Sequence, residues 1–428
     1  MTTRLRIAVI GLGYVGLPLA VALARSFEVV GFDASAQRLE ELGRGYDRTG
    51  EVPDERLQES SLRLVSDPEA MRGADVFIVT VPTPVNDNNL PDLASVRAAC
   101  RTAGRVIAKG GIVVLESTVY PGVTEDICGP EIEAASGLRC GVDFFLGYSP
   151  ERINPGDRQH TVDRITKVVS GQTPAVAAKL AEVYGAVNGG KIFIARDIKT
   201  AEAAKVIENA QRDINIAFIN EVTMIFNKMG LSVHDVLAAS ATKWNFLPFA
   251  PGFVGGHCIG VDPFYLAHLA HTLGHHPEII LAGRRINDGM GGYVANAIAK
   301  ILAERRGNHD NARILVLGLT FKENIPDLRN SKVVDLIKGL RAAGHVVEVH
   351  DPHADPAEAK AFYRIDLQPE LAGLAGYDCV VGAVAHDEYR ALSARDFARI
   401  VKADGLVADV KGMWRKAELP ATMIRWEL

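Results

Sequence analysis

The sequence lacks the features that mark membrane-spanning, disulfide-stabilised and nucleic-acid-binding proteins. No apolar run approaches the length of a membrane span, and the longest runs, such as residues 74–81, suit buried strands. The five cysteines are scattered and form no CxxC pair, which argues against a disulfide framework and against a zinc site. The formal net charge is only −5 at pH 7. It therefore gives no electrostatic reason to expect a nucleic-acid or membrane partner.

Composition and length indicate an ordinary globular protein of more than one domain. The chain has 428 residues, of which 48% are hydrophobic and 23% charged. The first residues lead directly into a predicted strand at 6–10, without an apolar signal region and cleavage site. Together with an odd number of scattered cysteines, this predicts a reducing compartment, the cytoplasm.

Strand and helix patterns divide the chain into three parts. The first alternates short β-rich runs with helical stretches, which predicts parallel strands and right-handed crossovers. Two further β-like runs, 167–170 and 191–195, are expected to extend that sheet. Residues 201–229 have helical spacing and end at Gly230, and a second helical block covers about 278–305. Beyond residue 312, alternating strands and helices return and predict a second α/β domain.

A GxGxxG stretch joins the first predicted strand to a helix. It consists of Gly11, Leu12, Gly13, Tyr14, Val15 and Gly16. Glycines there permit a tight turn and the close approach of a pyrophosphate, whose charge rests on the helix N-terminus. Asp33 ends the next predicted strand, and its carboxylate suits a ribose diol and repels a 2′-phosphate. NAD is therefore the predicted cofactor. NADP is the less favoured alternative, because Arg38 could accept such a phosphate.

Two more loops with polar residues follow predicted strands of the first domain. They are Thr-Val-Pro-Thr-Pro at 80–84, which contains Thr83, and Glu-Ser-Thr-Val-Tyr-Pro-Gly at 116–122, which contains Thr118. Either loop alone is better explained as an ordinary Thr/Pro turn. Because ligands of open α/β sheets lie beyond the carboxyl ends of the strands, the two together predict part of a binding site.

Cys258 is the strongest candidate for a reactive side chain. The segment 251–263, Pro-Gly-Phe-Val-Gly-Gly-His-Cys-Ile-Gly-Val-Asp-Pro, places four glycines around it and Asp262 four residues later. A single cysteine is usually a small buried apolar residue, and that interpretation is kept for the other four. At Cys258 the glycines instead predict a backbone that admits a ligand and presents the thiol to it.

Three further side chains could assist a thiol. Lys205 and Asn209 are four residues apart on the predicted helix 201–229 and therefore share one face. A solvated lysine face is the usual alternative, but their neighbours are mostly apolar. A desolvated Lys205 could stay protonated and stabilise an oxyanion, or act as a base if its pKa fell. Segment 148–156, which contains Glu151, brings a carboxylate suited to activating water.

The last domain offers cations without a glycine-rich turn. Lys322 and Arg329, in the loop after the predicted strand 313–319, are reasonable clamps for a diphosphate. Asp351 ends the following strand as Asp33 does in the first domain. Because the GxGxxG turn is missing, we interpret Asp351 as structural.

Taken together, these motifs resemble the UDP-glucose/UDP-N-acetylhexosamine 6-dehydrogenase family. The resemblance runs through essentially the whole chain. It rests on GLGYVG, TVPTP, ESTVYPG, YSPERINPGD, AKVIEN, GGHCIGVDP and FKENIPDLRNS. Two segments, GFVGGHCIGVDPFYL and HPEIILAGRRIND, are most similar to the N-acetylhexosamine branch that includes enzymes of Vi-type capsular polysaccharide synthesis.

The resemblance implies a fold of two doubly wound, Rossmann-like α/β domains joined by a helical domain with a long central helix. The implied boundaries are 1–200 for NAD binding, 201–306 for dimerisation and catalysis, and 307–428 for UDP binding. It also implies a homodimer or higher homo-oligomer. The substrate would be a UDP-N-acetylhexosamine. We expect no metal cofactor, no nucleic-acid partner and no membrane partner.

The resemblance further implies NAD-dependent, four-electron oxidation of the sugar C6 alcohol to a uronic acid. Cys258 would form a thiohemiacetal and then a thioester, while Lys205 and Asn209 would stabilise the oxyanion. Asp262 and Thr118 would hold the water or a proton relay, and Glu151 would assist hydrolysis. Arg329 would reach the cofactor. The implied substrate contacts are Tyr148, Glu151, Arg152, Lys205, Asn209, Gly255 and Lys322.

Two departures from the family pattern favour the N-acetyl branch: the glucose enzymes commonly have lysine where Val261 stands and serine or tyrosine where His257 stands. A third departure is Ile325, where the FK motif of the family often has threonine. We therefore predict UDP-N-acetylglucosamine as substrate for surface polysaccharide precursors, with UDP-GalNAc, UDP-ManNAc and UDP-glucose as alternatives. An imidazolium at His257 would instead lower the pKa of the neighbouring thiol.

Two other classes of function compete with this hypothesis. A two-electron hydroxy-acid dehydrogenase would share the sheet and central helix, with Lys205 as base and Cys258 as a bystander. A catalytically inactive regulator would bind NAD or a nucleotide sugar without turning it over. Every candidate catalytic residue is present, so the sequence offers no sign of lost activity.

Overall fold

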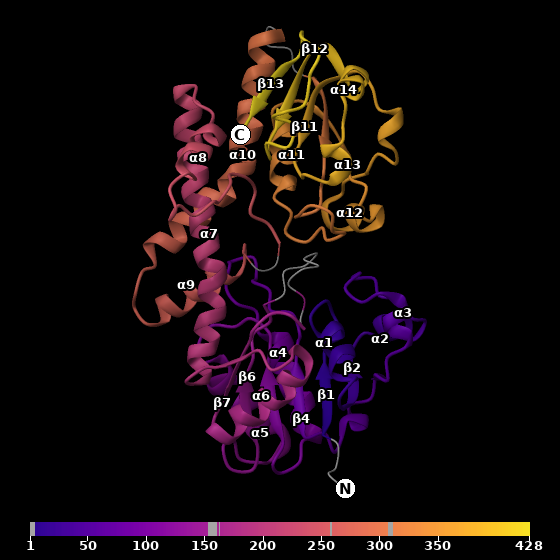
Figure 1. The fold of residues 1–428 in the computed structure, drawn as a ribbon, viewed down its shortest axis with the longest axis vertical. Helices are drawn as coiled ribbons and strands as arrows, with labels where there is room; N and C mark the ends of the chain where they lie inside the picture. Colours follow the sequence, from indigo (N-terminus) through magenta and orange to yellow (C-terminus); the bar gives the residue numbers. More distant parts are fainter. Residues whose placement is uncertain (1–4, 153–160, 162, 257–258, 307–310) are drawn as a thin grey trace. The chain divides into compact units, whose positions relative to one another are not determined.

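The computed structural model describes residues 5–152, 161, 163–256, 259–306 and 311–428 (Figure 1). The chain divides into two compact units. One unit comprises Met1–Glu208 and Phe264–His275, and the other Asn209–Pro263 and His276–Leu428. No helix in the described part of the chain combines the length and the apolar character needed to cross a bilayer.

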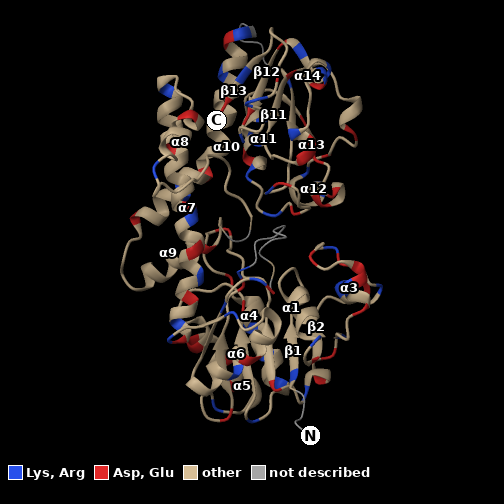
Figure 2. Cartoon of the chain, viewed as in Figure 1, with Lys and Arg blue, Asp and Glu red and all other residues tan. Residues whose placement is uncertain are grey.

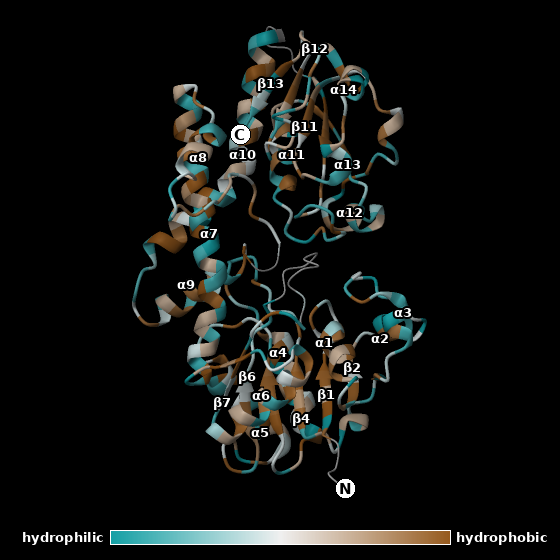
Figure 3. Ribbon diagram, viewed as in Figure 1, coloured by the Kyte–Doolittle hydropathy of each residue, from teal (hydrophilic) through white to brown (hydrophobic). Residues whose placement is uncertain are grey.

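The first unit is built on an eight-stranded sheet with the order β3-β2-β1-β4-β5-β6-β7-β8. The strands are β1 (Arg6–Ile10), β2 (Glu28–Phe32), β3 (Arg63–Val65), β4 (Val76–Val79), β5 (Ile112–Leu115), β6 (Phe145–Tyr148), β7 (Lys167–Gly171) and β8 (Ile192–Ile194). Strand β4 is buried throughout, as expected for a parallel strand covered on both faces. Figure 3 shows it among the most apolar parts of the unit, and Figure 2 shows it without charged residues. The predicted α/β architecture is confirmed.

One pairing in this sheet departs from the prediction of parallel strands. Strands β1 to β6 pair in parallel, whereas β7 runs antiparallel to β6, with Tyr148 opposite Ser170. An antiparallel neighbour needs no helical crossover, and the described residues between β6 and β7 form no helix. The direction of β7 therefore depends on its connection, which the alternating pattern of apolar residues does not reveal.

Helices cover the sheet of the first unit. On one face, α1 (Gly16–Leu23) and α6 (Pro174–Asn188) share a core with alternate side chains of β1, β4 and β5, including Ile7, Val9 and Val114. Helices α4 (Ala94–Val106) and α5 (Gly129–Ser136) pack against each other. The shorter elements are α2 (Ala36–Gly43), α3 (Asp54–Gln58), η1 (Pro68–Met71) and the π-helical turn η2 (Val123–Cys128).

The central helix α7 (Ile198–Met229) is the longest of the described helices and begins three residues before the predicted start. Its continuation is α8 (Val233–Ser240), α9 (Asp262–Thr272) and α10 (Glu278–Arg306). The prediction that the middle of the chain is helical is confirmed, and the predicted block at 278–305 corresponds to α10.

The second unit contains a five-stranded parallel sheet with the order β10-β9-β11-β12-β13. The strands are β9 (Arg313–Leu317), β10 (Val346–His350), β11 (Tyr377–Gly382), β12 (Val401–Asp409) and β13 (Ile424–Glu427). Helices α10 and α11 (Val333–Ala342) pack on one face, and α13 (Asp387–Arg390) and α14 (Ala394–Ile400) on the other. Helix α12 (Pro356–Tyr363) and the turn η3 (Leu371–Gly373) complete the unit. Edge strand β13 was not predicted, because its four half-buried residues carry little signal.

Candidate active site

The glycine turn after β1 has the geometry of a dinucleotide site. Gly11 adopts φ +96°, and a Cβ at Gly16 would overlap the Gly11 carbonyl oxygen and the Thr80 hydroxyl. The Thr80 hydroxyl donates to the Gly11 carbonyl at 2.7 Å and so braces the turn. Gly13 faces open space, because no atom lies within 4 Å of an added Cβ. A pyrophosphate can therefore approach this backbone at the N-terminus of α1, so the residues present fit NAD.

Asp33 and Arg38 both form hydrogen bonds with the backbone of the same turn, at Leu12. Asp33 accepts from the Leu12 N–H at 2.8 Å and from the Ser35 N–H at 2.8 Å, while its side chain stays partly exposed. Arg38 is buried, with Nε donating to the Leu12 carbonyl and Nη2 to Asp47 at 2.7 Å. Burial opposes ionisation of Asp47, but the Arg38 hydrogen bond helps to hold its pKa below the ordinary value. Because Arg38 is paired in this way, it is poorly placed to receive a 2′-phosphate, and NAD is favoured over NADP.

The loop that contains Thr118 is tied to the central helix by Glu202. This carboxylate accepts from the Gly122 and Thr124 N–H groups, at 2.6 and 2.9 Å, and from the Thr124 hydroxyl. Burial raises the pKa of Glu202 to about 7, against the hydrogen bonds that favour the anion. Glu202 lies three residues before Lys205 on α7, so it links the loop after β5 to the turn of helix that carries the lysine.

Glu151 belongs to a buried network of charged groups. Lys167 lies 2.8 Å from Glu116 and 3.7 Å from Glu151, and Tyr184 donates to Glu116. Burial raises the pKa of Glu116, although the Lys167 charge opposes this shift. The pKa of Lys167 is raised, because the two carboxylates outweigh the effect of burial. The network places Glu151 beside the fixed cation of Lys167.

Lys205 and Asn209 lie on a buried polar stripe of α7. Both side chains are buried, as are Glu202 and Asp213 on the same face. The Asn209 amide donates to Asp262 at 2.5 Å, which joins α7 to the first residue of α9. Two residues that the sequence analysis proposed separately, Asn209 and Asp262, are therefore brought together.

The glycine-rich segment before Cys258 is fitted to its surroundings, although Cys258 and His257 lie outside the described residues. Asn220 accepts from the Gly252 N–H at 2.8 Å and donates to its carbonyl at 3.0 Å. A Cβ at Gly255 would lie 2.6 Å from the Asn330 carbonyl, and one at Gly256 would lie 2.7 Å from the Phe321 ring. The glycines thus let this segment pack directly on the loop that follows β9.

A hollow in the second unit brings three lysines together. Lys322, Lys332 and Lys411 line it with one carboxylate, Glu323. Burial lowers the pKa of Lys411, and Glu323 opposes the shift. Lys332 also forms an ion pair with Asp288 at 2.8 Å. The remaining lining residues are Phe253, Gly255, Phe321, Ser331, Val333, Ala383 and Val384. Cations and an aromatic ring at the carboxyl ends of β9, β11 and β12 suit a nucleoside diphosphate.

The other predicted residues occupy varied positions. Arg152 pairs with Glu208 on α7 at 2.7 Å, and Tyr148 is fully buried, with its hydroxyl donating to the Ser117 carbonyl. Arg329 forms two hydrogen bonds to Asp327, at 2.9 and 2.6 Å. Thr83 and Thr118 are partly exposed in the loops after β4 and β5. The roles of these residues in binding and catalysis stay predictions.

Four supporting residues were not found from the sequence: Glu116, Lys167, Glu202 and Lys411. Glu202 alone left a usable signal, a carboxylate on the same helix face as Lys205 and Asn209. Glu116 follows β5, and Lys167 begins β7 at the same edge of the sheet because β7 runs antiparallel to β6. Lys411 lies far from the other pocket residues in sequence.

The chain matches three domain models of one family. Residues 5–188 match the NAD binding domain of the UDP-glucose/GDP-mannose dehydrogenase family, 199–289 its central domain and 315–416 its UDP binding domain. The chain is 51% identical to protein CapL of Staphylococcus aureus, over 99% of both chains. It is 50% identical to the UDP-N-acetyl-D-glucosamine 6-dehydrogenase of Pseudomonas aeruginosa, over 95% of this chain and 96% of that protein.

Solved structures agree with these matches. A UDP-D-ManNAc dehydrogenase from Pyrococcus horikoshii superposes with a TM-score of 0.89 at 29% identity, over 99% of both chains. The nucleotide turn, the lysine-lined hollow and the matches along the whole chain lead to one conclusion. The chain belongs to the UDP-glucose/GDP-mannose dehydrogenase family and is an NAD-dependent nucleotide-sugar dehydrogenase.

Proposed function

We propose that the chain is a UDP-N-acetyl-D-glucosamine 6-dehydrogenase, which oxidises the sugar C6 alcohol to a carboxylate for surface polysaccharide precursors. Two relatives at 50% and 45% identity carry that name, from Pseudomonas aeruginosa and Salmonella typhi. The hydrogen bond between Asn209 and Asp262 is the structural observation that best supports the proposed mechanism. It orients an amide on α7 toward the start of α9, four residues after Cys258 in sequence.

In the first oxidation the C6 alcohol loses a hydride, passes its hydroxyl proton to the water or proton relay held by Asp262 and Thr118, and becomes an aldehyde. Bound NAD⁺ supplies the hydride acceptor for each of two oxidations. The buried cation of Lys205 stabilises negative charge that develops on the sugar oxygen. The Asn209 amide, with one hydrogen engaged by Asp262, keeps a second for the same oxygen.

In the second oxidation Cys258 acts as the nucleophile. Its sulfur adds to the aldehyde carbon and forms a thiohemiacetal, which loses a second hydride and a proton to become a thioester. Water then cleaves the carbon–sulfur bond, releases the carboxylate and regenerates the thiol. Glu151, held near Lys167, accepts the proton of that water, and Thr118 and Asp262 position it.

The proposed organisation has three parts, 1–200, 201–306 and 307–428, for NAD binding, dimerisation with catalysis, and UDP binding. A homodimer is supported by exposed apolar side chains on α7. Ile207, Phe218, Ile225 and Met229 are each at least half exposed and recur at helical spacing. The variant Phe218→Glu should therefore shift the protein from dimer to monomer in light scattering. A cytoplasmic location is proposed from the scattered cysteines.

Turnover assays with four sugars test the function. Purified protein is incubated with UDP-GlcNAc, UDP-GalNAc, UDP-ManNAc or UDP-glucose, while NADH is followed and products are identified by mass spectrometry. We expect UDP-GlcNAc to react fastest, with two NADH per uronic acid. Cys258→Ala should abolish acid formation, whereas Cys140→Ala should retain it. One NADH per sugar, or full activity of Cys258→Ala, would exclude the thioester mechanism, and faster turnover of another sugar would change the substrate.

A further inference from the structure

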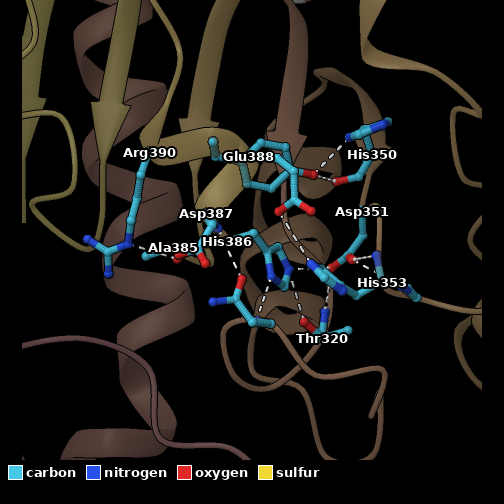
Figure 4. Close-up of polar contacts among 12 residues, drawn as sticks. Thr320, His350, Asp351, His353, Ala385, His386, Asp387, Glu388 and Arg390 are labelled. Carbon is cyan, nitrogen blue, oxygen red and sulfur yellow. Dashed lines mark hydrogen bonds and ion pairs between the residues drawn. The ribbon is translucent and has the colours of Figure 1, made fainter. Parts of the chain in front are cut away.

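His386 lies completely buried between β11 and α13 and contacts the loop that leads to Lys322 (Figure 4). Its Nδ1 accepts a hydrogen bond from the Asn324 N–H at 2.9 Å. Its Nε2 lies 3.1 Å from the Asp351 carboxylate and 3.2 Å from the Thr320 hydroxyl. None of these contacts was apparent from the sequence, because the partners are 35, 62 and 66 residues away.

The hydrogen bonds determine the protonation state of the ring. A backbone N–H only donates, so Nδ1 carries no proton and Nε2 carries the proton of a neutral imidazole. The Thr320 hydroxyl donates to the Lys322 carbonyl at 3.0 Å, so its oxygen is free to accept from Nε2 together with Asp351. His386 is therefore a donor at one nitrogen and an acceptor at the other.

Asp351 continues the connection into the backbone of the loop. Its Oδ2 accepts from the Leu319 and Thr320 N–H groups, at 2.5 and 2.9 Å, and its Oδ1 from the His353 and Ala354 N–H groups. Burial opposes the charge, but the His386 hydrogen bond and these donors hold the pKa of Asp351 well below its usual range. The carboxylate is thus a charged anchor for the beginning of the loop.

The two ends of the loop 319–324 are held by this pair of side chains. Asp351 binds the first end, and His386 binds the second at Asn324, which adopts φ +58°. The Asn324 side chain also accepts from the Asp387 N–H at 3.0 Å. Between the two ends lie Phe321 and Lys322, which line the lysine hollow.

We propose that His386 is a positioning residue for nucleotide binding, which closes the loop 319–324 so that Lys322 and Phe321 face the UDP moiety. This inference rests on the proposed function. Neutral His386 contributes through both nitrogens: the donor at Nε2 orients Asp351, and the acceptor at Nδ1 binds Asn324. Because the Phe321 ring packs against Gly256, the same loop supports the segment that precedes Cys258.

Three variants separate the two nitrogens. His386→Asn keeps an acceptor near the Nδ1 position, His386→Gln keeps a polar group near Nε2, and His386→Leu keeps neither. We expect His386→Leu to raise the Kd for UDP and the KM for UDP-sugar about 10- to 100-fold, since two buried hydrogen bonds are lost. His386→Asn and His386→Gln should each restore part of that loss, and kcat should change less than KM.

Calorimetry with UDP and, separately, NAD⁺ provides the readout, because the predicted NAD turn lies in the other unit. The matched control is the variant His353→Asn. In the native protein the His353 ring centre lies 4.6 Å from that of His386, and the His353 side chain contacts Glu388. The variant should leave the Kd for UDP within about twofold, well below the tenfold step of one lost hydrogen bond.

Two outcomes would overturn the role of His386. One is an unchanged Kd for UDP in all three variants, measured on protein whose circular dichroism is native. The other is an equal loss of NAD⁺ and UDP affinity, which would indicate general loosening. If the leucine variant does not fold, the asparagine and glutamine variants decide by the same criteria. Failure of the unmodified protein to bind UDP would instead contradict the proposed function.

Discussion

The turns that follow β1 and β9 have the same backbone design but different surroundings. Gly11 and Gly318 adopt φ +96° and +98°, and each donates to the last residue of the neighbouring strand, at 2.8 and 2.9 Å. The next residue in both cases is leucine, whose N–H donates to an aspartate, Asp33 or Asp351. Two α/β domains with little sequence in common therefore begin their ligand-binding edge in the same way.

The difference lies in what covers the aspartate. Asp33 stays partly exposed, and the chain enters helix α1 at Gly16. Asp351 is buried beneath His386, and the chain continues through a loop that holds Lys322 before reaching α11 at Val333. An exposed carboxylate can bind a ribose, whereas a covered one can only organise protein. We therefore expect the same turn to serve direct recognition of the ribose in one domain, whereas in the other it supports the loop of Lys322.

A second contrast concerns two buried carboxylates that both accept backbone N–H groups. Burial raises the pKa of Glu202 to about 7, and the acidic side chain of Glu125 adds to the shift. For Asp351 burial acts in the same direction, but the His386 contact and the backbone donors reverse the result. An additional polar partner therefore decides whether a buried anchor stays charged near neutral pH.

Of the predictions that test this comparison, Gly16→Ala should have the largest effect on ligand binding. The new methyl group would overlap the Gly11 carbonyl and the Thr80 hydroxyl, so the turn must move. We expect the Kd for NAD⁺ to rise at least about 100-fold, since the pyrophosphate depends on this backbone. Calorimetry with UDP on the same variant should give an unchanged Kd. Parallel loss of both ligands would show that the two turns are not independent.

Asp351→Ala should destabilise the second unit by about 3–5 kcal/mol, because several buried N–H groups and His386 lose their acceptor. Hydrogen exchange measured by mass spectrometry should show faster exchange across 318–324 and β9. Asp33→Ala is the matched control in the first unit. This variant should lower the free energy of unfolding of the first unit by less, about 1–2 kcal/mol, because Asp33 accepts fewer hydrogen bonds and is partly exposed. Equal losses would remove the contrast.

Glu202→Gln should change how stability depends on pH. The folded pKa of about 7 lies above the ordinary 4.5, so the folded state retains a proton that the unfolded state has lost between these values. The free energy of unfolding of the native protein should therefore fall by about 2–3 kcal/mol as the pH rises from 4.5 to 7. The free energy of unfolding of Glu202→Gln, measured by urea unfolding, should not show this fall between pH 4.5 and 7. Glu221→Gln, exposed on the same helix, should retain it.

Asp33→Asn should have the smallest effect. The amide oxygen can still accept from the Leu12 N–H, so the turn should persist. Loss of the carboxylate should raise the KM for NAD⁺ about tenfold and narrow the preference over NADP⁺. Steady-state kinetics with both cofactors measures the effect. An unchanged KM would mean that Asp33 supports the turn only, as Asp351 does in the second unit.

Local patterns of apolar residues in the sequence predicted most of the fold. Apolar runs at strand spacing predicted β1, β2, β9 and β10 at or near their observed ends, and helical spacing predicted α7 and α10. The antiparallel direction of β7 and the edge strand β13 were not predicted, because strand direction and edge pairing depend on connections and partners elsewhere in the chain.

By itself, the sequence determined the order of the motifs, the nucleotide turn, and the candidate residues Lys205, Asn209, Cys258 and Asp262. Those features are contiguous or share one helix, so residue type and spacing reveal them. Only the tertiary structure decided which side chains support them, as His386 does for the loop of Lys322 and Glu202 for the loop of Thr118. Buried hydrogen bonds join residues that are 60 to 80 positions apart, and their partners are set by strand order and helix packing.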